Sequence, residues 1–120
     1  VLGGLNLTTR DYARMGQMFL QNGAYNGRQI VPASWVAAST APTAPTTAGA
    51  IGYGYQWWIP QGAPAGEFMA RGVYGQYIYI NRADGVVIAT NAADRQFREA
   101  GVSQQNVDIF RLISTTVEDM

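Results

Sequence analysis

Residues 67–91 contain three short runs with the pattern of β-strands, joined by connections too short for parallel pairing. The first run is "EFMARG", the second is the alternating "QYIYI", and the third is "VVIATN". A Gly-x-x-Gly corner at 72–75 joins the first two, and a turn with Asp84-Gly85 at its tip joins the last two. Because a parallel crossover needs about a dozen residues or more, this segment predicts an antiparallel meander.

The amino-terminal part has helical periodicity. From Thr8 to Asn22, apolar or small residues recur at the i, i+3, i+4, i+7 and i+8 positions of an amphipathic helix. Thr8 is suited to cap its start and Gly23 to end it in the left-handed conformation. Gly16 costs about 1 kcal/mol against Ala inside a helix, so its presence predicts close packing against a neighbouring element.

Two further helices are expected. A short one begins at Pro32 and continues through "ASWVAAS". A closing helix spans Asn106 to Val117, and one side of it carries the apolar residues Ile109, Phe110, Ile113 and Val117. Helices gathered on an antiparallel sheet predict the α+β class.

The segment "GYGYQWWIP", residues 52–60, is read as one aromatic strand. Alternation would send Tyr53, Tyr55 and Trp57 to one face and Gly54, Gln56 and Trp58 to the other. Both Trp rings can belong to the core under a covering helix, or one of them can pack a ligand or partner. The preceding stretch, residues 40–50, is rich in Ala, Pro, Thr and Gly and predicts an irregular loop.

Length and charge limit the class of protein. The chain has 120 residues, 48% of them hydrophobic and 13% charged, which suits a globular unit with its own core. Its formal net charge is zero and no basic cluster is present, so a nucleic-acid partner is not expected. No apolar run reaches the roughly 20 residues of a membrane span. The cellular compartment stays open.

Several catalytic groups are missing altogether. The sequence has no Cys and no His, and all eight cationic side chains are Arg. A Ser-His-Asp triad, a Cys-His pair, a His or Cys zinc site and a Schiff-base Lys are therefore excluded within the chain. No metal or other cofactor is implied. The opening "VLGGLNLTTRDYARM" lacks the features of a signal peptide and is interpreted as the interior of a longer protein.

Three stretches in order resemble one known family. "MARGVYGQYIYINRADGVVIATN" resembles the third signature region of the serine β-lactamase and penicillin-binding-protein superfamily, in its class C-like branch. "LNLTTRDYARMGQMFLQNGAYNGRQIVPASWV" is similar to the family's Thr-capped helix and the turn after it, and "GYGYQWWIP" to the aromatic strand before the signature. Together they cover most of the chain, and they are most similar to 6-aminohexanoate-dimer hydrolases and related esterases.

The resemblance implies a role for the Gly-rich corner. Ala70-Arg71-Gly72 takes the place of the family's Lys-Thr-Gly triplet, and the residue after the triplet donates a backbone N–H to the oxyanion hole. That residue is Val73, and Gly72 would let the backbone approach a substrate closely. Ala70 cannot replace the triplet's Lys, so β-lactamase activity is not expected. Arg71 carries a cation, but strand alternation points it away from the face of Ala70.

Other substrate contacts follow only from position. The candidate substrate-binding residues are Tyr74, Gly75, Gln76, Arg71, Trp58 and Trp57. Hairpin packing is an equally weighted interpretation for Tyr74 and Gln76.

The family's Ser-x-x-Lys nucleophile has no match. The serines, each without a Lys three residues later, are Ser34, Ser39, Ser103 and Ser114. The sequence therefore predicts that residues 1–120 are the carboxyl-terminal portion of a β-lactamase-like serine hydrolase. Such a portion would work with the upstream part of the same protein on a small ester or amide and would be inactive alone.

Two alternatives compete with this interpretation. In the first, Trp57, Trp58, Tyr74 and Tyr77 form an aromatic platform of a non-catalytic module that binds a sugar or peptide. In the second, the chain is a structural domain that dimerises through a bare sheet edge.

Overall fold

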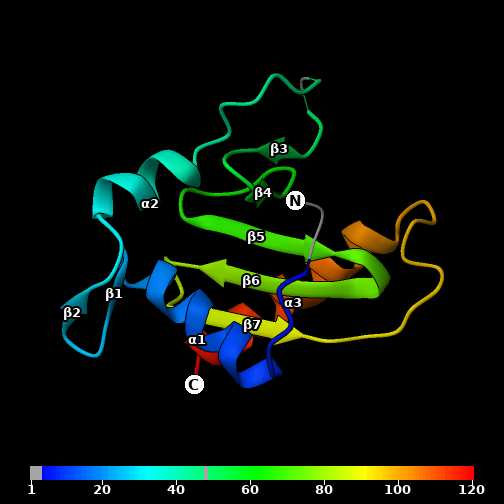
Figure 1. Ribbon diagram of the computed structural model, residues 1–120. Coiled ribbons are helices and arrows are strands. Elements are labelled where there is room, and N and C mark those ends of the chain that lie inside the picture. The colour runs from blue at the N-terminus through cyan, green and yellow to red at the C-terminus, as the bar shows by residue number, and fades with distance from the viewer. Residues whose placement is uncertain (1–3, 48) are drawn as a thin grey trace.

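The computed structural model describes residues 4–47 and 49–120. Its main sheet has five antiparallel strands in the order β3-β4-β5-β6-β7 (Figure 1). The elements are α1 (Thr9–Leu20), β1 (Ala24–Tyr25), β2 (Arg28–Gln29), α2 (Ala33–Ser39), β3 (Gly52–Tyr53), β4 (Trp58–Ile59), β5 (Glu67–Gly72), a 3-10 turn (Val73–Gly75), β6 (Gln76–Asn81), β7 (Val86–Thr90) and α3 (Val102–Glu118). The predicted α+β class is confirmed.

The predicted meander is present in β5, β6 and β7. Strand β5 pairs antiparallel with β6 from Glu67 opposite Asn81 to Gly72 opposite Gln76. Strand β6 pairs in turn with β7, from Tyr77 opposite Thr90 onwards. Since β5 and β7 both run antiparallel to β6, they point the same way, and their carboxyl ends lie at the same end of the sheet.

The sheet has a separate hydrophobic core on each face. The first contains Phe19, Val36, Trp57, Phe68, Ile78 and Ile80, with α1 residues packed against it. The second contains Met69, Tyr77, Tyr79, Val107 and Phe110, the last two from α3. Successive residues of β5 and β6 alternate between these cores, as the two-residue period of a strand requires. The helices α1 and α3 therefore cover opposite faces of the sheet.

Helix α1 is capped and packed as its sequence predicts. The Thr8 side chain accepts a hydrogen bond from the Asp11 N–H at 3.1 Å, and Gly23 after the helix has a φ of +90°. A Cβ added at Gly16 would lie 2.7 Å from Val87 Cγ1 and 2.8 Å from Ile78 Cγ2. The missing side chain thus lets α1 lie directly on β6 and β7.

The predicted single strand over residues 52–60 is wrong. The chain forms two short strands that pair with each other, and Gln56 between them has a φ of +71°. Tyr53 and Trp58 are cross-strand partners with ring centroids 4.5 Å apart, so they share the face that alternation would have separated. The turn inside the segment resets the alternation.

The preceding loop is irregular in residues 40–47 and 49–50, as predicted, and residue 48 lies outside the described residues. Helix α2 begins at Ala33, one residue after the predicted start.

The closing helix is present, but three of the four residues on its predicted apolar side are turned outward. Helix α3 starts at Val102, four residues earlier than expected, and buries Val107, Phe110 and Ser114. The outward residues Ile109, Ile113 and Val117 are 40% to 49% exposed. No helix in the described part of the chain is long and apolar enough to cross a membrane.

Hydrogen bonds of two polar side chains on α3 explain why its buried face differs from the predicted one. Arg111 bonds the carboxylate of Glu67 through Nε and Nη2, with a shortest distance of 2.7 Å. Ser114 Oγ donates to Asp84 Oδ2 at 2.6 Å. Both partners lie at the end of the sheet where β5 begins and where β6 turns into β7. Pairing Glu67 and Asp84 with α3 fixes the face of the helix that packs on the sheet. Leaving a buried charge unpaired costs more free energy than exposing the apolar side chains of Ile109, Ile113 and Val117.

Candidate functional site

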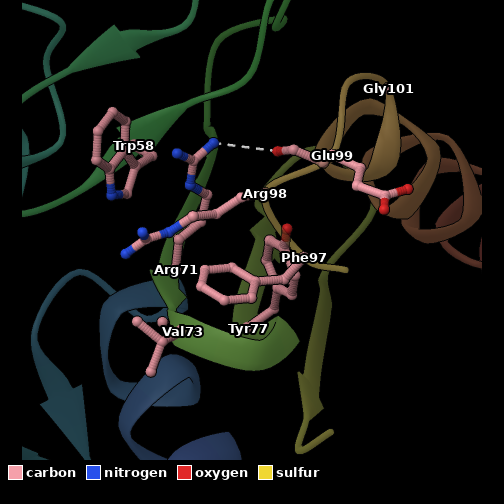
Figure 2. A pocket seen from close by; sticks show the side chains of 10 residues that line it. Trp58, Arg71, Val73, Tyr77, Phe97, Arg98, Glu99 and Gly101 are labelled. Carbon is pink, nitrogen blue, oxygen red and sulfur yellow. Dashed lines mark hydrogen bonds between the residues drawn. The ribbon is translucent and has the colours of Figure 1, made fainter. Parts of the chain in front are cut away.

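A cavity of about 400 Å³ lies at the end of the sheet that holds the carboxyl ends of β5 and β7 (Figure 2). It is lined by Trp58, Arg71, Gly72, Val73, Tyr77, Phe97, Arg98, Glu99, Gly101 and Ser103. These residues come from β4, from β5 and its corner, from β6, from the segment that leads from β7 into α3, and from the first turn of α3. Four of the eight predicted site residues, Trp58, Arg71, Gly72 and Val73, are therefore brought together.

The Gly-rich corner is a tight hairpin turn. Gly72 is extended, with φ −126° and ψ 167°, and Val73–Gly75 then form a single 3-10 turn. Tyr74 and Gly75 have positive φ values of 64° and 90°. A Cβ added at Gly72 would lie 3.0 Å from the Cβ of Gln76, so a larger residue would press against the opposite strand.

Val73 stands at the exposed end of this corner. It is 53% exposed and contributes to the cavity wall. Within the described residues, no side chain and no backbone acceptor outside the hairpin's own strands and 3-10 turn receives its N–H.

Arg71 lies on the cavity side of β5. Its guanidinium carbon is 4.3 Å from the ring centroid of Trp58, and Nη1 donates to Ser103 Oγ at 3.1 Å. Ala70 packs on the opposite face, against the core under α1. The predicted division between Ala70 and Arg71 is confirmed, and Arg71 is directed toward the start of α3.

Tyr74 and Gln76, which flank Gly75, hold the segment after β7 in place. The Gln76 side-chain amide donates to Ala92 O at 2.5 Å and accepts from Ala92 N at 3.0 Å. Tyr74 O accepts from the Asp94 N–H at 3.0 Å, and its ring stands edge-on to Phe97 with centroids 5.3 Å apart. All three lie outside the cavity lining. These contacts match the hairpin-packing interpretation of Tyr74 and Gln76.

The four rings of the alternative aromatic platform do not all share one surface. Trp57 is 5% exposed and belongs to the core under α1, whereas Tyr77 belongs to the core under α3. Trp58 packs against the α3-side core and faces the cavity. The structure thus separates Trp57 from the other predicted contacts.

Sequence reasoning missed six of the ten residues that line the cavity. The lining residues that it did not foresee are Tyr77 as a wall residue, Phe97, Arg98, Glu99, Gly101 and Ser103. The segment 91–101 has no periodicity and no motif, so its composition gave no signal. Strand direction could have found it, because the chain after β7 must leave from the edge where β5 reaches its Gly-rich corner.

The cavity holds more positive than negative charge on its side chains. Arg71 and Arg98 line it with one carboxylate, that of Glu99. Among residues 4–47 and 49–120, the ion pairs are Arg14 with Asp11 and Arg111 with Glu67, and neither includes a cavity residue. The same residues contain no group of three or more Asp, Glu, His or Cys that could hold a metal ion.

The antiparallel sheet, the helices on its two faces and the corner after β5 define a β-lactamase-like α+β fold. A solved structure from Bacillus anthracis, provisionally named a 6-aminohexanoate-dimer hydrolase, superposes with a TM-score of 0.77 at 32% identity, covering 98% of this chain and 31% of that chain. A 6-aminohexanoate-dimer hydrolase from Paenarthrobacter ureafaciens is 32% identical over an alignment of 96 residues, and the match covers 72% of this chain and 24% of the relative.

By sequence and by fold, the chain is homologous to part of the 6-aminohexanoate-dimer hydrolases. A scan against protein-family models finds no match. The chain spans about a quarter of the length of the curated relative and just under a third of the structural one.

Proposed function

We propose that residues 1–120 are the carboxyl-terminal portion of a serine hydrolase that cleaves ester or amide bonds, and that the Val73 N–H is one donor of its oxyanion hole. The observation that carries this proposal is the position of Val73. It follows an extended Gly72, opens a tight turn and lies half-exposed at the wall of a cavity. Both named relatives are described as hydrolases.

The reaction needs groups that this chain does not contain. A serine oxygen from elsewhere in the protein attacks the carbonyl carbon of the substrate, and the carbonyl oxygen becomes negative. The Val73 N–H stabilises that oxygen, the leaving alcohol or amine takes a proton, and an acyl-enzyme forms. Water then attacks the acyl carbon and releases the acid. Lys and Tyr side chains outside the 120 residues would move the protons.

A proline at position 73 tests the donor role in the full-length hydrolase. Val73 begins a helical turn, and the Gly72 angles suit a residue before proline, so Val73→Pro removes the N–H with little change of backbone. We expect kcat to fall about 100-fold or more, since one oxyanion donor is worth about 3 to 4 kcal/mol. Val73→Ala keeps the N–H and serves as the matched control.

Turnover that stays at the wild-type value in a folded Val73→Pro protein would contradict the assignment of Val73 to the oxyanion hole.

A fluorophosphonate probe tests the location of the nucleophile separately. The isolated 120-residue chain should not be labelled at any serine, because none has a Lys three residues later. Covalent labelling of the isolated chain would contradict the placement of the nucleophile outside it.

A further inference from the structure

The segment between α1 and α2 contains the dipeptide Asn-Gly twice, at 22–23 and at 26–27. Both asparagines are exposed and have positive φ values, 55° and 51°. The second pair lies at the tip of the β1–β2 hairpin, which projects at one side of the molecule (Figure 1). The two pairs therefore share a sequence and an asparagine φ, but their surroundings differ.

An asparagine followed by glycine has an intramolecular reaction open to it. The deprotonated backbone nitrogen of the glycine attacks the side-chain amide carbon of the asparagine, a C–N bond forms, and the amide nitrogen leaves as ammonia with the proton that the glycine N–H gave up. Water opens the resulting cyclic succinimide at either carbonyl and gives aspartate or isoaspartate. Glycine favours the attack because it has no Cβ to block the approach and lets the backbone rotate. The reaction therefore needs a glycine nitrogen without a hydrogen bond and a peptide unit that can turn.

The first Asn-Gly pair is held against this reaction. Gly23 is buried, and its N–H donates to Met18 O at 2.8 Å at the end of α1. A Cβ added at Gly23 would lie 2.1 Å from Val31 O, so the neighbouring chain leaves this peptide little room to rotate. The carbonyl of Asn22 accepts a hydrogen bond from the Gln29 side-chain amide at 2.7 Å. Reaction at Asn22 must wait until the end of α1 opens.

The second Asn-Gly pair has none of these restraints. Within the part of the chain that the structure describes, the Gly27 N–H has no acceptor and the Asn26 side chain has no hydrogen-bond partner. A Cβ added at Gly27 would meet no atom within 4 Å. Each strand of the hairpin has two residues, and so short a ladder opens easily. The peptide between Asn26 and Gly27 can therefore rotate and bring the two reacting atoms together.

We propose that Asn26 is a site of spontaneous deamidation, with water as the only co-reactant, and that the fold protects Asn22. The inference is independent of the proposed hydrolase function. The product carries a carboxylate close in sequence to Arg28 in place of a neutral amide. Where the succinimide opens to isoaspartate, the main chain of the turn gains a methylene, and the pairing of Tyr25 with Arg28 loses its geometry.

Incubation of the folded full-length protein in isotopically heavy water at mildly alkaline pH tests the proposal. Each deamidation takes up one solvent oxygen, which mass spectrometry detects. Trypsin releases residues 15–28 as one peptide, so fragment ions report both Asn-Gly pairs from the same molecules. We expect Asn26 to react at least about 10-fold faster than Asn22, because hydrogen bonds and packing hold the first pair. In protein unfolded by urea, which is the control, the two pairs should react at similar rates.

Equal rates for the two pairs in the folded protein would overturn the proposal, as would faster reaction at Asn22. A folded protein in which Asn26 stays intact while the unfolded protein reacts would show that the turn protects it, which also overturns the proposal. Asn26→Gln is the matched variant, since its side chain keeps the amide but must close a larger ring. It should abolish the fast uptake of oxygen and leave the slow uptake at Asn22 unchanged.

Hydrogen exchange tests the effect of isoaspartate on the hairpin. Gly23 O accepts from the N–H groups of Ile30 and Val31, at 2.8 and 3.1 Å, directly after β2. These two N–H groups should exchange about 10-fold faster in protein enriched in isoaspartate than in wild type, because the altered turn no longer holds β2 in register. Asn26→Asp adds the charge without the extra methylene and should exchange like wild type. Equal exchange in all three proteins would contradict the loss of register.

Discussion

Glu67 is a buried carboxylate with two side-chain partners. It is 3% exposed, its carboxylate accepts from Arg111 Nη2 at 2.7 Å, and it also accepts from the Tyr79 hydroxyl at 2.5 Å. Burial, followed by the hydrogen bond with Glu67, raises the pKa of Tyr79, which keeps that hydroxyl protonated and able to donate. A carboxylate at this depth is stable only because both partners are present.

We therefore expect Glu67→Gln to lower the free energy of unfolding by about 3 kcal/mol. The amide keeps the volume of the side chain but leaves the partly buried Arg111 without a counter-ion. Urea denaturation followed by circular dichroism measures the change. The control is Asp11→Asn, whose ion pair with Arg14 is roughly half exposed on both sides, and it should cost much less than Glu67→Gln. Equal losses of unfolding free energy in the two variants would show that burial does not make the pair of Glu67 and Arg111 more stabilising than the exposed pair.

Residues of the site differ in how far the sequence could reveal them. Arg71, Gly72 and Val73 follow from a resemblance to a signature region, and strand alternation gives the face on which Arg71 lies. Arg98 and Phe97 lie in a segment whose conformation depends on contacts with Tyr74 and Gln76 rather than on its own pattern. No local rule of sequence describes such contacts, so that part of the cavity required coordinates.

Helix α1 shows how one small residue sets the distance between two elements. Ala at position 16 would gain about 1 kcal/mol of helix propensity, but its Cβ would lie within 2.8 Å of Val87 and Ile78 side-chain carbons. Both neighbours are β-branched and therefore stiff. Overpacking of this kind costs about 1 to 3 kcal/mol, so the packing term outweighs the propensity term.

Gly16→Ala should thus destabilise the protein by about 1 kcal/mol despite its favourable helix propensity. Thermal unfolding of Gly16→Ala and of Gln17→Ala, an exposed neighbour on the same helix, gives the comparison. The second variant should be neutral or slightly stabilising. A more stable Gly16→Ala protein would mean that α1 does not lie directly on the sheet.

Most of the helices and strands can be predicted from the sequence. Strong periodicity and caps located α1, and turn residues located the β5-β6-β7 meander. The rotation of α3 was not readable, because it follows from Arg111 and Ser114 reaching partners 44 and 30 residues away. The break inside "GYGYQWW" was hidden for a related reason, since Gln56 adopts a positive φ that its residue type does not favour.

The response to pH is a property of the whole molecule, whose formal net charge is zero and whose sequence pI is about 6.3. One contribution comes from the place where the end of α3 meets the turn between β6 and β7. A hydrogen bond with Asp84, followed by repulsion from its charge, raises the pKa of Glu118 above its ordinary value of 4.5. Asp119 adds a smaller repulsion of the same sign.

The sign of this effect follows from proton binding. A raised pKa means that the folded state holds more protons than the unfolded state between the two pKa values. The stabilising contribution of Glu118 is therefore complete below the ordinary pKa and is lost as the pH rises through the raised one. Ionised Glu118 and Asp84 then repel each other in the folded protein.

Glu118→Gln should flatten this part of the stability curve. Its free energy of unfolding should fall less steeply than that of the wild type as the pH rises from about 4 through the raised pKa, because the amide remains neutral. Denaturant unfolding at a series of pH values measures both curves. Asp108→Asn, on the same helix, is the control for removing one negative charge, and its curve should keep the wild-type slope in this window. Parallel curves for wild type and Glu118→Gln would show that Asp84 does not raise the pKa of Glu118, and the end of α3 would then lie farther from the β6–β7 turn than this structure places it.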